Sequence, residues 1–192
     1  MEVRAPATSA NLGPGFDCLG LALGLYLDIR ASEQEGTGLE IVASGEGRGL
    51  VPLDHNNAVY KGLARAYAEF GRTPGKIVLE IASDIPLASG LGSSAAALVA
   101  GLAAGATLCG EMPDREDLVR WGVAMEGHPD NVAPCVKGGI VIAALDEEEV
   151  TSARIDPPAS LVAVVAVPCF SVRTSKSRRV LSERVARADA VY

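Results

Sequence analysis

One uncharged stretch constrains the fold of this chain more than any other feature. From position 86 the sequence runs PLASGLGSSAA, and no charged residue occurs over 88–110. Gly90 and Gly92 permit a sharp turn and a close approach of the backbone to a ligand, because glycine lacks a Cβ. The alanine-rich residues that follow predict a helix over 93–108. The Val, Ile and Leu residues that precede the glycines predict a strand over 76–83.

A transmembrane helix is the competing interpretation of 88–110, since this stretch is long and contains a Gly101-xxx-Gly105 pair. Most of its residues, however, are Ala, Gly or Ser, and its flanks carry no basic anchors. Such a composition inserts poorly into a bilayer. We therefore expect a tightly packed internal helix of a soluble protein.

The overall composition excludes several classes of protein. With 192 residues, 48% of them apolar and 21% charged, the chain has a globular composition rather than a disordered or collagen-like one. Its formal net charge of −7 argues against a nucleic-acid-binding protein, which normally carries a basic surface. The cysteines lack metal-ligand spacing, and the first residues, MEVRAPATSAN, lack the features of a signal peptide. We expect a cytoplasmic protein with reduced thiols and neither nucleic-acid nor membrane partners.

Hydrophobic patterning predicts a mixture of strands and helices. Strands are predicted at 21–32, 39–44, 76–83, 139–145 and 161–167, and helices at 57–70, 93–108, 114–125 and 176–187. Because the two types alternate irregularly, an α+β fold is favoured over a strict βαβ repeat. The Pro157-Pro158 step is the best candidate for a domain boundary.

The glycine turn and the helix after it have the features of a phosphate-binding site. A helix N-terminus offers unpaired N–H groups and the positive end of the helix dipole. Ser93 and Ser94 add hydroxyls, one of which could reach a phosphate-bound Mg²⁺. The alternative is a serine-capped helix after a glycine turn, with no ligand. A Walker A loop is excluded because no lysine follows the glycines.

The loop does not match two other known glycine motifs. The spacing of Gly90, Gly92 and Ala95 loosely matches a dinucleotide fingerprint, but residues 84–89 separate it from the preceding strand. The GxSxG pattern of a nucleophile elbow is absent. A third kind of phosphate loop remains.

Three sequence blocks together resemble one enzyme family. They are PLASGLGSSAA at 86–96, APATSANLGPGFDCLGLA at 5–22 and EGHPDNVAP at 126–134. The first resembles the ATP loop of the GHMP kinases, and the other two resemble the homoserine kinases within that family. The resemblance spans essentially the whole chain and implies an ATP- and Mg²⁺-dependent transfer of phosphate to the side-chain hydroxyl of L-homoserine, in threonine biosynthesis. It further implies an N-terminal domain like ribosomal protein S5 domain 2 over 1–155 and the beginning of a C-terminal α+β domain over 156–192.

The resemblance also implies a role for each matching residue. Asn131, Ser94 and Glu126 would be catalytic, and Ser94 and Glu126 would hold Mg²⁺. The substrate would be bound by Asn11, Asp17, Thr174 and Arg178. The nucleotide would be bound by Asn57, Pro86, Leu87, Ala88, Ser89, Gly90, Leu91, Gly92, Ser93, Ser94, Ala95 and Ala96. His128 and Asp130 are not assigned as general bases, because positioning and charge neutralisation carry such phosphoryl transfers.

Independent physical arguments support two parts of this assignment. Asn11 and Asp17 lie in a Gly/Pro-rich loop, where side chains are presented rather than buried. A ligand-free Asx-turn loop is the alternative there. Lys176, Arg178 and Arg179 fall in the first turns of a predicted helix, where cations oppose the helix dipole unless an anion binds. The alternative there is a solvated basic face.

The sequence departs from the family pattern in its last part. The family's C-terminal glycine-rich motif and its second substrate-binding arginine are missing, which predicts an N-terminal portion of a longer enzyme. Two alternatives to a homoserine kinase stay open. One is another GHMP kinase, acting on mevalonate or a diphosphocytidyl-methylerythritol, and the other is an inactive ATP-binding fragment. Assembly as a homodimer is also left open.

Overall fold

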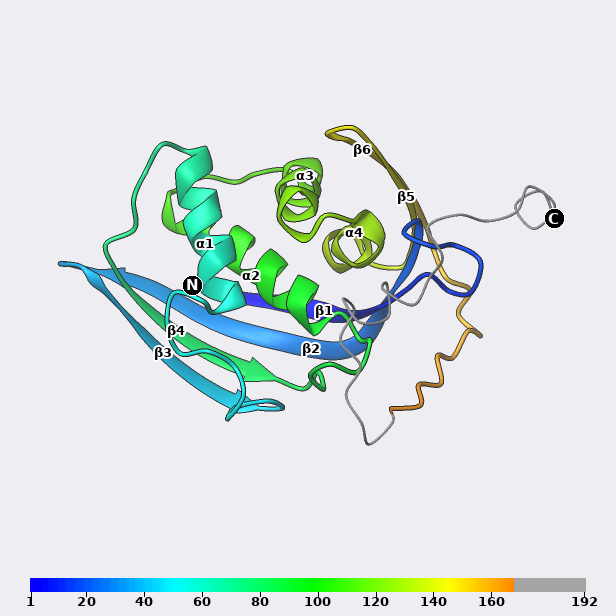
Figure 1. The fold of residues 1–192 in the computed structure, drawn as a ribbon, viewed down its shortest axis with the longest axis horizontal. Coiled ribbons are helices and arrows are strands. Elements are labelled where there is room, and N and C mark those ends of the chain that lie inside the picture. Colours follow the sequence, from blue (N-terminus) through cyan, green and yellow to red (C-terminus); the bar gives the residue numbers. More distant parts are fainter. Residues whose placement is uncertain (168–192) are drawn as a thin grey trace, which may run out of the picture.

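The computed structural model describes residues 1–167, which form one sheet and four helices. Figure 1 shows the arrangement along the chain. The strands are β1 (Glu2–Ala10), β2 (Leu19–Gln34), β3 (Gly38–Gly45), β4 (Lys76–Ser83), β5 (Ile140–Asp146) and β6 (Glu149–Ile155). The helices are α1 (Ala58–Glu69), α2 (Ser93–Leu108), α3 (Arg115–Glu126) and α4 (Pro129–Lys137).

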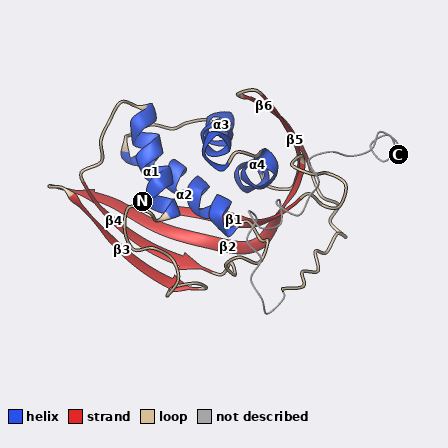
Figure 2. Cartoon of the chain, in the orientation of Figure 1, coloured by secondary structure: helices blue, strands red, loops and turns tan. Residues whose placement is uncertain are grey.

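The six-stranded sheet is mostly antiparallel and has the order β3-β4-β2-β5-β6, with β1 paired to β2. One pair, β3 and β4, is parallel, and α1 lies between these strands in the sequence as their crossover connection. The helices lie together on one face of the sheet (Figure 2). This segregation of helices to one face of a largely antiparallel sheet confirms the predicted α+β class.

The glycines of α2 allow it to pack closely against α1. A Cβ on Gly101 would overlap the carbonyl oxygen of Val59, and one on Gly105 would overlap that of Leu63. Gly62 of α1 makes the reciprocal approach to the backbone of α2. The Gly101-xxx-Gly105 pair is therefore a helix-packing motif within the core, as expected. In the described part of the chain, no helix has both the length and the hydropathy that spanning a bilayer requires.

Most of the predicted elements are present, with small shifts at their ends. The predicted bounds of β4 and α2 are those observed, and α1, α3, β2, β3 and β5 are shifted by one or two residues at their ends. Three elements were not predicted: β1, β6 and α4. The prediction of a strand at 161–167 is wrong, because this segment has no strand structure and its valines and leucine are exposed. The helix predicted at 176–187 lies outside the described residues.

Cysteine thiols in the described range are free, as expected. Cys18 is partly exposed, whereas Cys109 and Cys135 are buried. Burial raises the pKa of the Cys135 thiol to about 12. Cys135 therefore behaves as a small apolar core residue rather than as a nucleophile.

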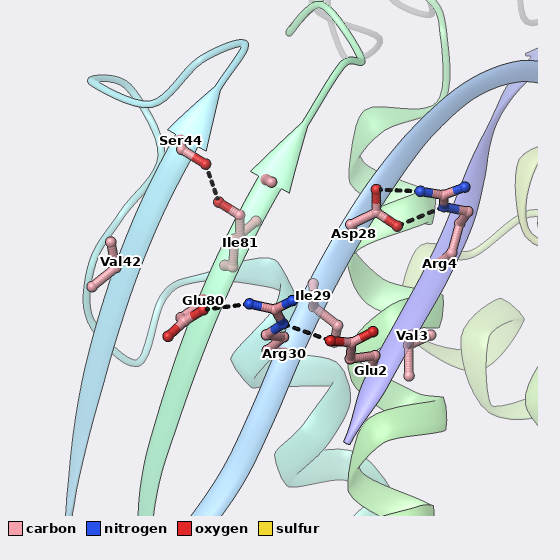
Figure 3. Close-up of a pocket in the computed structure, with 11 residues that line it drawn as sticks. Glu2, Val3, Arg4, Asp28, Ile29, Arg30, Val42, Ser44, Glu80 and Ile81 are labelled. Carbon is pink, nitrogen blue, oxygen red and sulfur yellow. Dashed lines mark hydrogen bonds and ion pairs between the residues drawn. The ribbon is translucent and has the colours of Figure 1, made fainter.

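The sheet face opposite the helices carries a groove of about 630 Å³ (Figure 3). Arg4 donates two hydrogen bonds to Asp28, at 2.7 and 3.0 Å, and these raise the pKa of its guanidinium. Arg30 forms ion pairs with Glu2 at 2.6 Å and with Glu80 at 3.7 Å. The charged side chains that line this groove are thus paired with one another, as on an ordinary solvated face.

Candidate active site

The glycine loop and the N-terminus of α2 form the centre of the candidate site. Ala88, Gly90 and Gly92 have φ values of 54°, 76° and 65°, so the chain makes repeated left-handed turns before the helix. Asn57 caps α1 and Asp114 caps α3, but no described side chain caps α2. The first N–H groups of α2 are thus arranged as anion-binding helix termini are.

Ser94 and Glu126 meet beside this loop, although they are far apart in the sequence. Ser94 lies in the first turn of α2 and Glu126 is the last residue of α3. The Ser94 hydroxyl donates a 3.4 Å hydrogen bond to Glu126 Oε2. A hydroxyl and a carboxylate beside a phosphate-type loop suit a hard cation, which prefers oxygen ligands and commonly takes few from the protein. These two residues therefore fit the Mg²⁺ expected from the sequence.

A pocket of about 270 Å³ extends from the glycine loop toward α1. Its walls are mainly apolar, and Ser93 and Ser94 lie at the end nearest the loop. Asn57 lines the pocket, but its amide has structural partners: Oδ1 accepts from Val59 N at 2.9 Å, and Nδ2 donates to Pro52 O at 2.7 Å. Asn57 thus fixes the pocket wall by joining α1 to the preceding loop. Val51, Pro52 and Leu87 also line the pocket, and of these the sequence analysis included only Leu87.

The loop between β1 and β2 has an unusual backbone. Asn11, Leu12 and Asp17 have φ values of 66°, 42° and 54°, in a region that L-residues rarely adopt. The Asn11 side chain stabilises this loop by accepting a 2.9 Å hydrogen bond from the Asp17 backbone N–H. Asn11 therefore orders the loop that presents Asp17. Residues with such a strained backbone persist only where the surrounding structure holds them in place. They cluster at functional sites.

The N-terminus of α4 brings further polar residues to the same place. Asp130 is only 2% exposed, and its Oδ1 lies 2.5 Å from His128 Nδ1. Ligand-type atoms of Asp17, His128 and Asp130 lie within 4.8 Å of one another. Asn131 connects this group to β1, because its Oδ1 accepts a 2.8 Å hydrogen bond from the buried hydroxyl of Thr8. Thr8 was not predicted as a site residue, because no local sequence signal distinguishes it from the other small residues of β1.

The structure therefore joins most of the expected residues into one continuous site. It runs from Asp17 through the start of α4 to the glycine loop, then to the Ser94–Glu126 pair and the apolar pocket. Thr174 and Arg178, which the sequence analysis expected to bind substrate, lie outside the described residues.

Part of the chain that forms this site is similar to a known protein family. Residues 57–139 match the model for the GHMP kinases N terminal domain, and this range includes α1, the glycine loop, α2, α3 and α4. Residues 57–139 are therefore similar to the N-terminal domain of the GHMP kinases. The GHMP kinase resemblance seen in the sequence is thereby confirmed over this range.

Homoserine kinases are similar to the chain over almost its whole length. A homoserine kinase of Deinococcus radiodurans is 48% identical over 99% of the chain, and one of Moorella thermoacetica is 44% identical over 99%. The chain spans 61% and 64% of the lengths of these two relatives. The crystal structure of a homoserine kinase from Cytophaga hutchinsonii matches with a TM-score of 0.80 and 32% identity, covering all of this chain and 62% of that one. A mevalonate kinase structure at 15% identity and a TM-score of 0.61 shares the fold alone.

Proposed function

We propose that this protein is an ATP-dependent kinase that phosphorylates the side-chain hydroxyl of L-homoserine, yielding O-phospho-L-homoserine and ADP. In the cell it would act in the cytoplasm, in threonine biosynthesis. The observation that carries the proposal is the Ser94–Glu126 pair beside an uncapped helix N-terminus and a glycine loop. The homoserine kinases at 44–48% identity support the choice of substrate. We further propose the division into a GHMP N-terminal domain at 1–155 and the start of a second domain at 156–192.

The nucleotide would occupy the pocket and the loop together. Its base would lie between the apolar walls near Val51 and Pro52, and its phosphates would reach the N-terminus of α2. Ser94 and Glu126 would hold Mg²⁺, which neutralises phosphate charge when bound. The backbone N–H groups of the loop would stabilise the charge that develops during transfer.

The substrate would lie on the other side of the loop. The Asp17 carboxylate would bind the ammonium group, and the conformation that Asn11 imposes on the loop would hold that carboxylate in place. Arg178 would bind the carboxylate of the substrate, and Thr174 would lie near the substrate. Asn131 would orient the hydroxyl that attacks the γ-phosphorus, while the bond to the ADP oxygen breaks. Because an amide is not a base, the hydroxyl proton would pass to the transferred phosphoryl group.

ADP release in the presence of Mg-ATP tests this function. The full-length protein and the 192-residue chain would each be assayed with L-homoserine, with mevalonate and without an acceptor. We expect release that depends on L-homoserine and exceeds the blank. Turnover of mevalonate but not of L-homoserine would show that L-homoserine is the wrong substrate. ATP binding without turnover of any acceptor by the full-length protein would contradict the kinase proposal.

A further inference from the structure

Thr8 occupies a junction between three parts of the site. It lies in β1 and is completely buried, and its backbone N–H donates a 3.0 Å hydrogen bond to the Leu91 carbonyl of the glycine loop. Its hydroxyl donates a 2.8 Å hydrogen bond to Asn131 Oδ1, at the start of α4. A single residue of the sheet thus contacts both the glycine loop and the residue proposed to orient the substrate hydroxyl.

A break in the strand directs this side chain inward. The β1–β2 register shifts between Pro6 and Thr8, and the consecutive residues Ala7 and Thr8 are both buried. In a regular strand, consecutive side chains point to opposite faces. Irregularities of this kind often redirect a side chain beside an active site. Thr8 therefore points toward the helices and away from the solvated face of the sheet.

Hydrogen bonds with Thr8 and Asp130 together hold the Asn131 amide in one orientation. The hydroxyl donates to Oδ1 at one end of the amide, and Nδ2 at the other end donates to Asp130 Oδ1 at 3.4 Å. Asp130 is itself buried and in contact with His128. Both ends of the Asn131 amide are thus engaged with side chains that have little freedom to move.

Gly92 closes the space above this pair. A Cβ at position 92 would overlap the Thr8 hydroxyl oxygen and lie 2.9 Å from Asn131 Oδ1. The backbone of the glycine loop therefore rests directly on the Thr8–Asn131 hydrogen bond. This contact links the position of the proposed phosphate loop to the orientation of the amide.

We propose that Thr8 is a positioning residue that holds the Asn131 amide in the orientation needed to direct the substrate hydroxyl at the phosphate. The proposal rests on the proposed function, because it assigns Thr8 to the same phosphoryl transfer. Thr8 touches neither substrate nor nucleotide and acts through Asn131. Replacing its hydroxyl by a methyl group should therefore lower kcat and leave the KM for ATP unchanged.

Three variants of the full-length protein test this role. Thr8→Val keeps the shape and the β-branch of the side chain, and we expect it to lower kcat by roughly 10-fold to 100-fold, as misplacement of a reacting group does. Thr8→Ser restores the hydroxyl and should recover most of the wild-type kcat. Thr107→Val is the matched control, because it removes an exposed hydroxyl that bonds only within α2. Wild-type kcat in Thr8→Val, or equal losses in Thr8→Val and Thr8→Ser, would overturn the proposal.

A double-mutant cycle separates this role from a purely structural one. In an Asn131→Ala background, Thr8→Val should cause no further loss of kcat, because the group it positions is gone. If Thr8→Val lowers kcat by the same factor with Asn131 present and with Asn131→Ala, Thr8 does not act through Asn131. A wild-type protein that turns over no acceptor would contradict the proposed function instead. In that event the free energies of unfolding of the same variants, measured in urea, would decide whether Thr8 and Asn131 are coupled. If the losses of the two single variants add up to that of the double variant, the proposal is overturned.

Discussion

At the scale of single residues, Ser94 and Glu126 are the most informative pair, because only the fold brings them together. We predict that Ser94→Ala and Glu126→Ala each lower kcat by about 100-fold or more, if charge stabilisation at the phosphates dominates catalysis. Turnover would be measured over a range of Mg²⁺ concentrations, and higher Mg²⁺ should partly restore the activity of each variant. Glu116→Gln, at the opposite end of α3, is the matched control and should leave kcat unchanged. Wild-type rates in both site variants would remove the pair from the mechanism.

Asp17 gives a second prediction at this scale. Asn tolerates the left-handed backbone that position 17 adopts, so Asp17→Asn removes the charge and keeps the loop conformation. We predict a raised KM for L-homoserine and an unchanged KM for ATP, because the ammonium group loses its partner while the nucleotide pocket is untouched. Steady-state kinetics with each substrate varied in turn measures both constants. An unaltered KM for L-homoserine would show that Asp17 does not bind the substrate.

At the scale of elements, close packing against α1 holds α2, the helix that follows the glycine loop. Gly101→Ala places a methyl group against the Val59 carbonyl, and such overpacking costs about 1–3 kcal/mol, more than the roughly 1 kcal/mol that alanine gains in helix propensity. We therefore predict a lower free energy of unfolding, measured in urea. Gly49→Ala makes the same change where no atom lies within 4 Å and should be close to neutral. Equal stability of both variants would contradict the close packing of the helices.

At the scale of the whole molecule, the two faces of the sheet have different roles. The helix side contains the core and the candidate site, whereas the opposite side carries the paired charges of Arg4, Asp28, Arg30, Glu2 and Glu80. Arg30→Gln should leave kcat and both KM values unchanged and should shift the urea midpoint less than Gly101→Ala does, because exposed ion pairs contribute little. A large loss of turnover in Arg30→Gln would show that this groove takes part in the function.

The sequence alone determined the features that depend on local chemistry. The glycine turn, α2 and β4 follow from backbone freedom, helix propensity and apolar patterning within a few residues, and all were predicted in place. Elements with weak local signals were missed: β1 is built largely of small residues, and α4 contains Pro134 within its length. Conversely, the valine-rich segment at 161–167 predicted a strand that the structure lacks, because a strand forms only where another strand pairs with it.

Only the tertiary structure decided which residues act together. Neither a hydrophobic period nor a motif indicates that Thr8 contacts Asn131, 123 positions away, or that Ser94 contacts Glu126, 32 positions away. The sequence predicted Ser94, Glu126 and Asn131 as separate site residues through their family resemblance. Their mutual geometry depends on the register shift in β1, the close packing of α1 on α2 and the turn into α4. These are long-range contacts, and a chain specifies them only through the packing of the whole core.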